Sequence, residues 1–349
     1  MPGSVIVSSA RTPIGKLSGA LASLPATDLG AHAIREALAR GEVGAEQVDY
    51  VIMGQVLQAG VGQMSARQAA TKAGIPMTVP AMTLNKVCLS GINAIYLADQ
   101  MIQAGDAEVV VAGGMESMTQ APYLLLSARE GYRMGNGELV DSMINDGLWC
   151  AFDAVHMGAG TERYTGELGG ITREAQDELA AQSHERAANA IKDGRFAEEI
   201  AAIEIPQRRG DPVVFDTDEG VRPGTTNESL GALRPAFAKD GTITAGNASQ
   251  ISDGGAAVIV TSVAKAEELG LTPIAELVSF GLVAGPDPSL LQQPSRAIKR
   301  ALEPIDMKVS DVDLFELNEA FAAVGIASMR DLGITDDIVN VNGGAIALG

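Results

Sequence analysis

The sequence predicts an α/β protein built from two similar halves, with a long segment inserted in the first half. Hydrophobic residues make up 46% of the 349 residues and aromatic residues only 4%. Ala, Val, Ile and Gly dominate, which is typical of a packed protein with buried central strands. Short apolar runs alternate with segments of helical periodicity. Residues 33–55 also align without gaps with residues 297–319, which indicates an internal duplication.

The first half shows a regular alternation of short apolar runs and helical segments. The expected strands cover residues 4–8, 50–56, 81–84 and 108–112, and the expected helices cover residues 26–40, 66–73 and the stretch between Cys88 and Gly105. Each helical segment ends at a glycine, which commonly follows a helix. The glycine pair Gly113-Gly114 closes the last strand. This order predicts a sheet covered by helices.

The texture of the sequence changes between residues 121 and 247, where glycines scatter and Val/Ile-rich runs become sparse. Periodic apolar residues predict a long helix over residues 172–193. We expect this segment to be an inserted loop domain, because long loops in compact domains are usually functional. Beyond it we expect a strand over residues 254–260, a helix over 264–269 and a strand over 274–283. The predicted domains are residues 1–120 plus 248–270, the inserted residues 121–247, and residues 271–349.

The internal repeat matches a helix-loop-strand unit in each half. By the same order, residues 81–84 correspond to residues 338–341, and Asn85 and Asn342 open corresponding turns. Because amphipathic patterns also recur by chance, shared non-apolar residues favour duplication. The sequence ends at Gly349, soon after the second turn, so we expect the natural protein to be longer. The identical pairs include Ala33/Ala297, Leu38/Leu302, Val48/Val312 and Asp49/Asp313.

Charge and cysteine content exclude several classes of protein. The formal net charge is −19, which argues against a general nucleic-acid surface because phosphate binding needs clustered Lys and Arg. Two cysteines give no disulfide framework and fit a reducing cytoplasm. The sequence shows no signal-peptide pattern and no apolar run of the roughly 18 residues that a membrane helix needs. It has no Walker loop, CxxC or HExxH motif, so we expect no metal site or nucleotide hydrolysis.

Cys88 lies on the predicted turn between the strand over residues 81–84 and the helix that ends at Gly105. Unpaired N–H groups at a helix N-terminus favour an anion, so we expect a lowered thiol pKa and a better nucleophile. The alternative is that Cys88 is a small buried hydrophobe, as most intracellular cysteines are. Cys150 has no helix-start signal and is interpreted as a packing residue.

Six motifs in order identify a family resemblance that covers residues 4–349. They are KVCLSG around Cys88, GGMESM from Gly113, HMG from His156, TAGNAS from Thr244, NEAFA from Asn318 and NVNGGAIALG from Asn340. Together they resemble the thiolases, and the HMG motif resembles their biosynthetic branch, the acetyl-CoA acetyltransferases. The resemblance implies the thiolase fold, in which two duplicated βαβαβ halves stack as α-β-α-β-α layers with an inserted loop domain.

The resemblance also implies a reaction. Cys88 takes the acyl group of acetyl-CoA as a thioester, and the carbanion of a second acetyl-CoA attacks it to give acetoacetyl-CoA and CoA. Asn318 holds a water in one oxyanion hole, and the backbone N–H of Cys88 contributes to the other; such donors typically supply about 10²–10³ in rate each. Glu319 is expected to orient its neighbours. CoA is a substrate and product, and no cofactor or metal is implied.

The family resemblance further assigns residues that contact CoA. They are Leu148, His156, Met157, Arg222, Ser229, Phe237, Ala245, Ser249, Ala320 and Phe321. Arg222 suits phosphate contact because its guanidinium is planar and always charged. The other two histidines, His32 and His184, are interpreted as exposed helix residues. The resemblance implies a cytoplasmic homotetramer, a dimer of dimers, with residues 122–140 as a candidate contact.

The family also uses a histidine in a Gly-His-Pro motif and a cysteine in a Cys-x-Gly motif, and both would follow Gly349. We therefore expect little or no thiolase activity from residues 1–349 alone. Two alternatives stay open: a degradative 3-ketoacyl-CoA thiolase of fatty-acid β-oxidation, and a non-catalytic acyl-CoA-binding protein on the same scaffold. The intact KVCLSG motif argues against the second alternative, because a binding protein needs no reactive thiol there.

Overall fold

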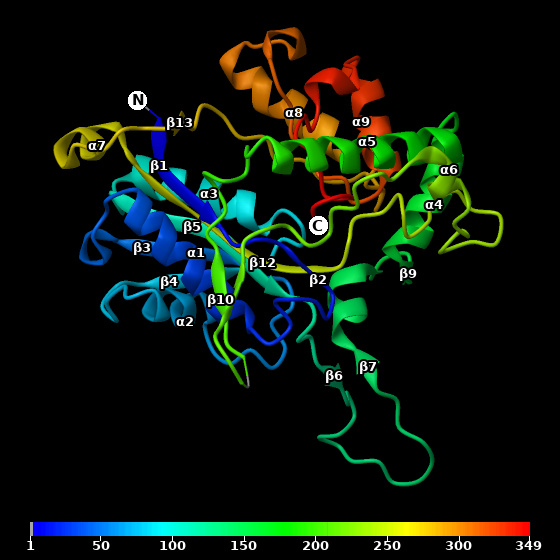
Figure 1. The fold of residues 1–349 in the computed structure, drawn as a ribbon, viewed down its shortest axis with the longest axis horizontal. Coiled ribbons are helices and arrows are strands. Elements are labelled where there is room, and N and C mark those ends of the chain that lie inside the picture. The colour runs from blue at the N-terminus through cyan, green and yellow to red at the C-terminus, as the bar shows by residue number, and fades with distance from the viewer. Residues whose placement is uncertain (1–2, 208) are drawn as a thin grey trace. The chain divides into compact units, whose positions relative to one another are not determined.

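The computed structural model describes residues 3–207 and 209–349 of the chain (Figure 1). The chain forms two compact units. Unit 1 comprises Met1–Leu148, Glu199–Thr217 and Ser252–Val278, and unit 2 comprises Trp149–Glu198, Asp218–Ile251 and Ser279–Gly349. These units are defined by contacts within the chain, so the three domains expected from the sequence stay a prediction.

Unit 1 is built on a mixed sheet with the strand order β13-β1-β12-β5-β3-β4, and β2 pairs with β12 at its side. The three strands β3, β4 and β5 are parallel, whereas β1 and β12 run antiparallel to their neighbours. The bounds are β1 Ser4–Arg11, β2 Gly15–Lys16, β3 Tyr50–Gly54, β4 Ala81–Leu84, β5 Val109–Ser117, β12 Ser252–Ser262 and β13 Ala275–Glu276.

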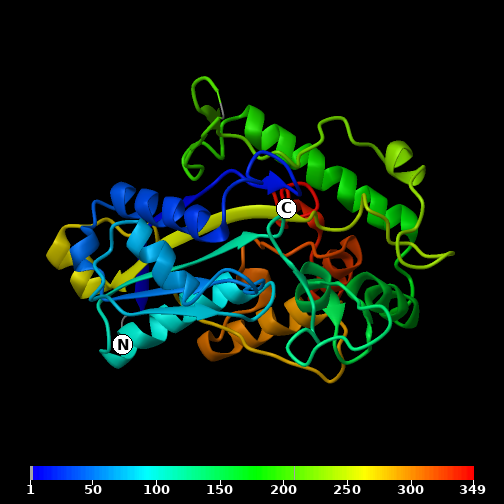
Figure 2. The same cartoon turned by 90° about the horizontal axis from the view of Figure 1, so that it is seen from below.

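Helices cover both faces of this sheet (Figure 2). On one face, α1 (Ala26–Arg40) and α2 (Ser65–Lys72) bury apolar side chains of β1, β3 and β5. On the other face, α3 (Ser90–Ala104) covers a separate set of side chains, which includes Ile52, Val110 and Val260. Central strands buried on both faces have continuous β-branched runs, and the Val109–Val111 run of β5 is one of them.

Shorter elements complete unit 1. The helix α7 (Val263–Leu269) ends at Gly270, and β6 (Tyr123–Leu124) pairs with β7 (Val140–Asp141) at the base of an extended loop (Figure 1). A π-helix, Met143–Leu148, follows that loop, and a small hairpin joins β10 (Ile203–Ile205) to β11 (Val213–Phe215).

Unit 2 is mostly helical. Its helices are α4 Met157–Leu168, α5 Arg173–Lys192, α6 Asn227–Gly231, α8 Gln293–Leu302 and α9 Ala322–Leu332, and it has a two-stranded piece, β8 Trp149–Cys150 with β9 Val155–His156. The two helices α5 and α9 pack on each other, and α9 is buried along most of its length. An apolar cluster centred on α9 forms the core of this unit.

The expected elements of the first half are all present, with one correction at the glycine pair. The strand β5 does not end at Gly113 but continues to Ser117. A Cβ atom at Gly113 would lie 2.1 Å from the carbonyl oxygen of Ala256 on β12. The glycine therefore lets two backbones approach closely inside the sheet rather than ending the strand.

The long strand expected over residues 274–283 is wrong. Only Ala275–Glu276 pairs, with Val5 and Ile6 of β1. The strand β1 begins at Ser4, so residues beyond Leu277 have no backbone edge of β1 to pair with. Apolar residues alone do not make a strand when no partner edge is available.

The two copies of the repeat keep the same local order but not the same strand. A short 3-10 helix, Ala45–Gln47, precedes β3, and another, Val309–Asp311, stands at the matching place of the second copy. Residues 312–319, however, make only one bridge, between Phe315 and Val339. Val51 pairs with Ala81 in the first copy, so Ala81 corresponds to Val339 and the predicted match of residues 81–84 to 338–341 is off by one residue.

Candidate active site

The turn that carries Cys88 connects β4 to α3 in unit 1. The Ser90 hydroxyl accepts a hydrogen bond from Lys86 N at 2.8 Å and donates one to Val87 O at 2.6 Å. Val87 has a φ of 51°, which is unusual for a β-branched residue. Such strain is commonly found where the surrounding structure holds a functional side chain in place. Cys88 itself is free and exposed, as a nucleophile for a bound substrate has to be.

The predicted lowering of the Cys88 pKa is wrong. Although the residue is exposed, the chain around the sulfur partly desolvates it, and this burial raises the thiol pKa above its ordinary value. The backbone N–H of Cys88 hydrogen-bonds the sulfur and lowers the pKa in part. The helix α3 begins only at Ser90 with Leu89 as its N-cap, so Cys88 lies before the first turn, where the helix dipole acts weakly.

The second corner, in unit 2, follows the segment that contains Asn318. Asn318 is exposed in an irregular stretch, whereas the next residue, Glu319, is buried. The Asn340 side chain bonds Leu317 twice: its Oδ1 accepts from Leu317 N at 2.8 Å and its Nδ2 donates to Leu317 O at 2.9 Å. The Asn340 side chain thus makes the two backbone hydrogen bonds that a neighbouring strand would make to Leu317. These bonds fix the backbone just before Asn318.

Glu319 ties three parts of unit 2 together. Its carboxylate accepts from Asn340 Nδ2 at 2.8 Å, from the Ser183 hydroxyl at 2.7 Å and from Ile346 N at 3.1 Å. Burial raises the Glu319 pKa, and these three donors oppose that rise. A Cβ at Gly344 would overlap the carboxyl group. The group is enclosed and fully used by its neighbours, which fits the predicted orienting role.

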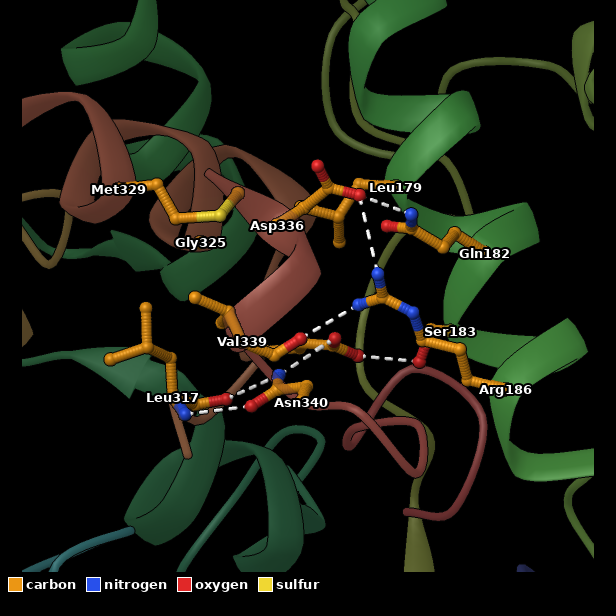
Figure 3. Close-up of a pocket in the computed structure, with 11 residues that line it drawn as sticks. Leu179, Gln182, Ser183, Arg186, Leu317, Gly325, Met329, Asp336, Val339 and Asn340 are labelled. Atoms are coloured by element: carbon orange, nitrogen blue, oxygen red, sulfur yellow. Dashed lines mark hydrogen bonds and ion pairs between the residues drawn. The ribbon is translucent and has the colours of Figure 1, made fainter. Parts of the chain in front are cut away.

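A small cavity of about 10 Å³ lies beside these residues (Figure 3). That volume is close to what one water molecule needs. Arg186 on α5 donates to Val339 O at 2.7 Å and pairs with Asp336 at 3.3 Å across the cavity. The cavity is lined by Leu179, Gln182, Ser183, Arg186, Leu317, Glu319, Gly325, Met329, Asp336, Val339 and Asn340.

Several residues predicted to contact CoA lie together in unit 2. The His156 ring stacks on Phe237 with centroids 4.7 Å apart, and Phe237 meets Phe321 edge to face at 6.1 Å. Met157, Phe237 and Ala320 pack against the same apolar cluster. A Cβ at Gly158 would lie 2.2 Å from the Phe237 ring, so the glycine of the HMG motif makes room for that ring.

His156 ends β9 and caps α4. Its Nδ1 accepts from Gly158 N at 3.1 Å, and burial lowers its pKa, which favours the neutral ring. Ser249 N donates to Ala320 O at 3.0 Å, which joins the TAGNAS and NEAFA segments. Ala245, from the same TAGNAS segment, is exposed.

Arg222 and Ser229 are both exposed. Ser229 on α6 forms a capping box with Thr226. Arg222 N donates to His184 Nδ1 at 3.2 Å. His184 is only 2% exposed, and burial followed by the nearby Arg222 charge lowers its pKa to about 4. The interpretation of His184 as an exposed helix residue is therefore wrong, and His32 is half-buried against Ala201 O.

Cys88 and Leu148 belong to unit 1, and the other ten predicted residues belong to unit 2. Leu148 ends the π-helix and is half-buried. Cys150 is buried, as the sequence predicts. Within residues 3–207 and 209–349, no group of His, Cys, Asp and Glu could hold a metal ion. No helix in the same residues is long and apolar enough to cross a membrane.

The sequence interpretation missed one side chain near the Cys88 turn. Glu116, inside the GGMESM motif, accepts from Val56 N at 2.7 Å and Leu57 N at 3.3 Å. Burial and the nearby Asp253 raise its pKa to about 7, although both N–H donors oppose that rise. The sequence signal that could have identified Glu116 is its position as a charged residue that follows the apolar run of a predicted buried strand.

Comparison with known proteins gives matches along the whole described chain. The family model "Thiolase, N-terminal domain" matches residues 4–264, and "Thiolase, C-terminal domain" matches residues 271–349. The chain is 59% identical to the "Probable acetyl-CoA acetyltransferase" of Mycolicibacterium smegmatis over 99% of its length and 89% of the relative. It is 56% identical to the acetyl-CoA acetyltransferase of Cupriavidus necator over 99% of its length and 88% of the relative.

A solved structure gives the same result for the fold. The crystal structure of the Bacillus anthracis acetyl-CoA acetyltransferase superposes with a TM-score of 0.96 at 42% identity, covering 100% of this chain and 88% of that one. The predicted fold class is therefore confirmed.

Proposed function

Since the chain belongs to the thiolase family, we propose that it is an acetyl-CoA C-acetyltransferase that works through a thioester on Cys88. The supporting observation is the exposed thiol of Cys88 on a strained turn between a strand and a helix, whereas the other cysteine, Cys150, is buried. Relatives named acetyl-CoA acetyltransferase align over nearly the whole chain, which supports this substrate over longer acyl chains.

In the first half of the reaction the Cys88 sulfur attacks the carbonyl carbon of acetyl-CoA. The bond between that carbon and the CoA sulfur breaks, and CoA leaves as a thiol with the proton that Cys88 gives up. Burial raises the Cys88 pKa, which disfavours the free thiolate, so the attack needs a group that takes the thiol proton. The carbonyl oxygen becomes negative at this step, and donors held in advance stabilise it.

In the second half a methyl proton of another acetyl-CoA is removed, and the resulting carbanion attacks the acetyl carbonyl. The carbon–sulfur bond to Cys88 breaks, acetoacetyl-CoA forms, and the proton ends on the Cys88 sulfur. We assign Asn318 to hold the water of an oxyanion hole. The support is local: Asn340 and Glu319 fix the backbone on both sides of this exposed side chain.

The CoA path is assigned to the residues that the family resemblance gave. The stacked His156 and Phe237 with the adjoining Phe321 present an apolar wall suited to a pantetheine arm. The exposed Arg222 is suited to a phosphate. Leu148, Met157, Ser229, Ala245, Ser249 and Ala320 complete this proposed set.

Assembly and location are part of the same proposal. The loop over residues 122–140 exposes large apolar side chains, among them Tyr123 at 64%, Leu126 at 68% and Met134 at 99%. Exposed apolar groups gathered on one segment favour contact with another subunit, which supports a homotetramer. Both cysteines are free thiols, which fits a cytoplasmic enzyme.

Trapping of the thioester tests the function. The chain is incubated with radiolabelled acetyl-CoA, quenched in acid and digested. We expect label on the peptide that contains Cys88, because labelling needs only the first half of the reaction and not full thiolase turnover. Cys88→Ala should abolish the label, whereas Cys150→Ala should keep it. Binding of CoA without any label on the unsubstituted chain would instead support the acyl-CoA-binding alternative and overturn the proposal.

A further inference from the structure

The loop that leaves β3 in unit 1 is clamped on one side by Glu116. The carboxylate stands near the end of β5 and receives two consecutive backbone N–H groups, from Val56 at 2.7 Å and from Leu57 at 3.3 Å. These contacts join residues 59 or 60 positions apart in the sequence. Two N–H groups directed at one carboxylate fix the orientation of the peptides that carry them.

The other side of the same loop is held by the corner of the Cys88 turn. Asn85 Nδ2 donates to Val56 O at 3.3 Å, and Asn85 Oδ1 accepts from Val87 N at 3.0 Å. Val87 is the residue with a φ of 51°, and Cys88 follows it directly. A line of contacts therefore runs from Glu116 through residue 56 and Asn85 to the strained residue beside the thiol.

We propose that Glu116 is a positioning residue for Cys88: its carboxylate holds the loop at residues 56–57, which in turn holds Asn85 and the Cys88 turn. Glu116 acts through the backbone and is assigned no contact with substrate. The inference rests on the proposed function only in taking Cys88 as the nucleophile.

The charge state of Glu116 matters to this clamp. An ionised carboxylate offers an acceptor to both N–H groups, whereas a protonated one turns an acceptor into a donor. Asp253 of β12 is the charged group that faces Glu116; it is fully buried and accepts from Thr119 N at 3.0 Å. Because the Glu116 pKa is about 7, the clamp changes strength across neutral pH.

The reactivity of the Cys88 thiol with iodoacetamide reports on this line of contacts without acetyl-CoA. Burial raises the thiol pKa and the backbone N–H of Cys88 opposes that rise; a loosened turn weakens this N–H contact. We expect Glu116→Gln to slow alkylation of Cys88 at pH 8 by about threefold to tenfold, the worth of one ordinary hydrogen bond. The glutamine side chain keeps one oxygen that can accept from one of the two backbone N–H groups. Its NH2 group would face the other backbone N–H, where it cannot accept a hydrogen bond.

Two controls separate positioning from general loss of structure. Glu108→Gln makes the same change at the residue before β5, where the carboxylate only meets Lys265 at 3.3 Å, and it should leave the Cys88 rate unchanged. Amide hydrogen exchange of β5 and β12 in the same sample reports any general opening of unit 1. Loss of the acetyl label with a normal alkylation profile would count against the proposed function and not against this inference.

A double-mutant cycle tests the path itself. Asn85→Ala should slow Cys88 alkylation, and adding Glu116→Gln should slow it no further, because both act through residue 56. In the unsubstituted chain, the alkylation rate should fall more steeply below about pH 7 than a single thiol ionisation predicts, because Glu116 gains a proton there. An unchanged rate in Glu116→Gln, multiplicative effects in the cycle, or a rate that follows a single thiol ionisation across pH 7 would each overturn the inference.

Discussion

The two copies of the repeat reach the same kind of corner by different means. In unit 1, β3 and β4 pair in parallel over four residues, and the turn to Cys88 follows that ladder. In unit 2, the equivalent pairing is a single bridge between Phe315 and Val339. The side chains of Asn340 and Glu319 supply the remaining contacts there.

The difference teaches where each corner is vulnerable. A backbone ladder accepts many side chains but needs room for the backbones to approach. A corner held by side chains needs particular polar groups, because a buried donor that loses its acceptor is costly. Substitutions in unit 1 should therefore destabilise the corner by steric crowding between backbones. Substitutions in unit 2 should destabilise it by removing hydrogen bonds.

The largest effect is expected from Gly113→Ala in unit 1. The new Cβ would lie 2.1 Å from Ala256 O, so β5 and β12 would have to separate. We expect a loss of about 3 kcal/mol or more in the free energy of unfolding, beyond ordinary overpacking. The adjacent Gly114→Ala is the matched control, since its nearest atom is 3.5 Å away and should cost less than about 1 kcal/mol.

Amide hydrogen exchange of β5 and β12 measures this pair of variants in place, because a two-unit chain need not unfold in one step. Equal loss of protection in both variants would contradict the idea that backbone approach limits the ladder.

The next effect is expected from Glu319→Ala in unit 2. The substitution removes one acceptor each from the Asn340 amide, the Ser183 hydroxyl and Ile346 N. We expect a cost of about 2–3 kcal/mol, seen as faster exchange of the Ile346 amide. The control is Glu185→Ala, an exposed glutamate on α5. Protection at Ile346 that survives Glu319→Ala would show that the corner does not depend on its side chains.

Sequence reasoning recovered the first corner better than the second for a physical reason. The strand over residues 81–84 and the helix after Cys88 form where local pattern and partner edge agree. Residues 312–319 carry the same pattern, but only Phe315 finds a partner. The hydrophobic pattern of a segment shows that it can form a strand. Whether it pairs depends on distant residues, which the local pattern does not contain.

The two units should also respond to pH in opposite directions. His184 in unit 2 has its pKa lowered to about 4, from an ordinary 6.5. Its neutral form is favoured in the folded state, so its contribution to stability is complete above pH 6.5 and is lost as the pH falls toward 4. At pH 4.5 we expect unit 2 to lose about 2 kcal/mol through this group.

Glu116 in unit 1 has its pKa raised from 4.5 to about 7. Its contribution is complete below pH 4.5 and is lost as the pH rises to about 7. Exchange protection of each unit, corrected for the intrinsic pH dependence, should separate the two trends. His184→Asn keeps an acceptor for Arg222 N but does not titrate, and it should flatten only the trend of unit 2; a flattened unit 1 would show that the trends are not separate.

The site residues show what motif reasoning can and cannot reach. His156, Phe237 and Phe321, which the motif positions assign to the proposed CoA path, are neighbours in unit 2. The predicted direction of the Cys88 pKa shift was wrong. Cys88 lies two residues before the first residue of α3, and local burial desolvates its thiol. The prediction that His184 is exposed was wrong, because the burial of a helix residue depends on what packs against its face of the helix. The backbone N–H of Arg222, which is distant in the sequence, donates to the His184 ring.

The smallest effect is expected at Arg222, whose exposed side chain is the proposed phosphate contact. Under the proposed function, Arg222→Gln should weaken CoA binding by about threefold, since an exposed ion pair contributes only modestly. Calorimetry at low salt and again at about 0.5 M salt should show the difference shrinking as the charges are screened. Arg234→Gln, another exposed arginine of unit 2, should bind CoA as the unsubstituted chain does. Equal weakening in both variants would mean that CoA responds to the total charge of this acidic protein and that Arg222 has no particular place in its binding.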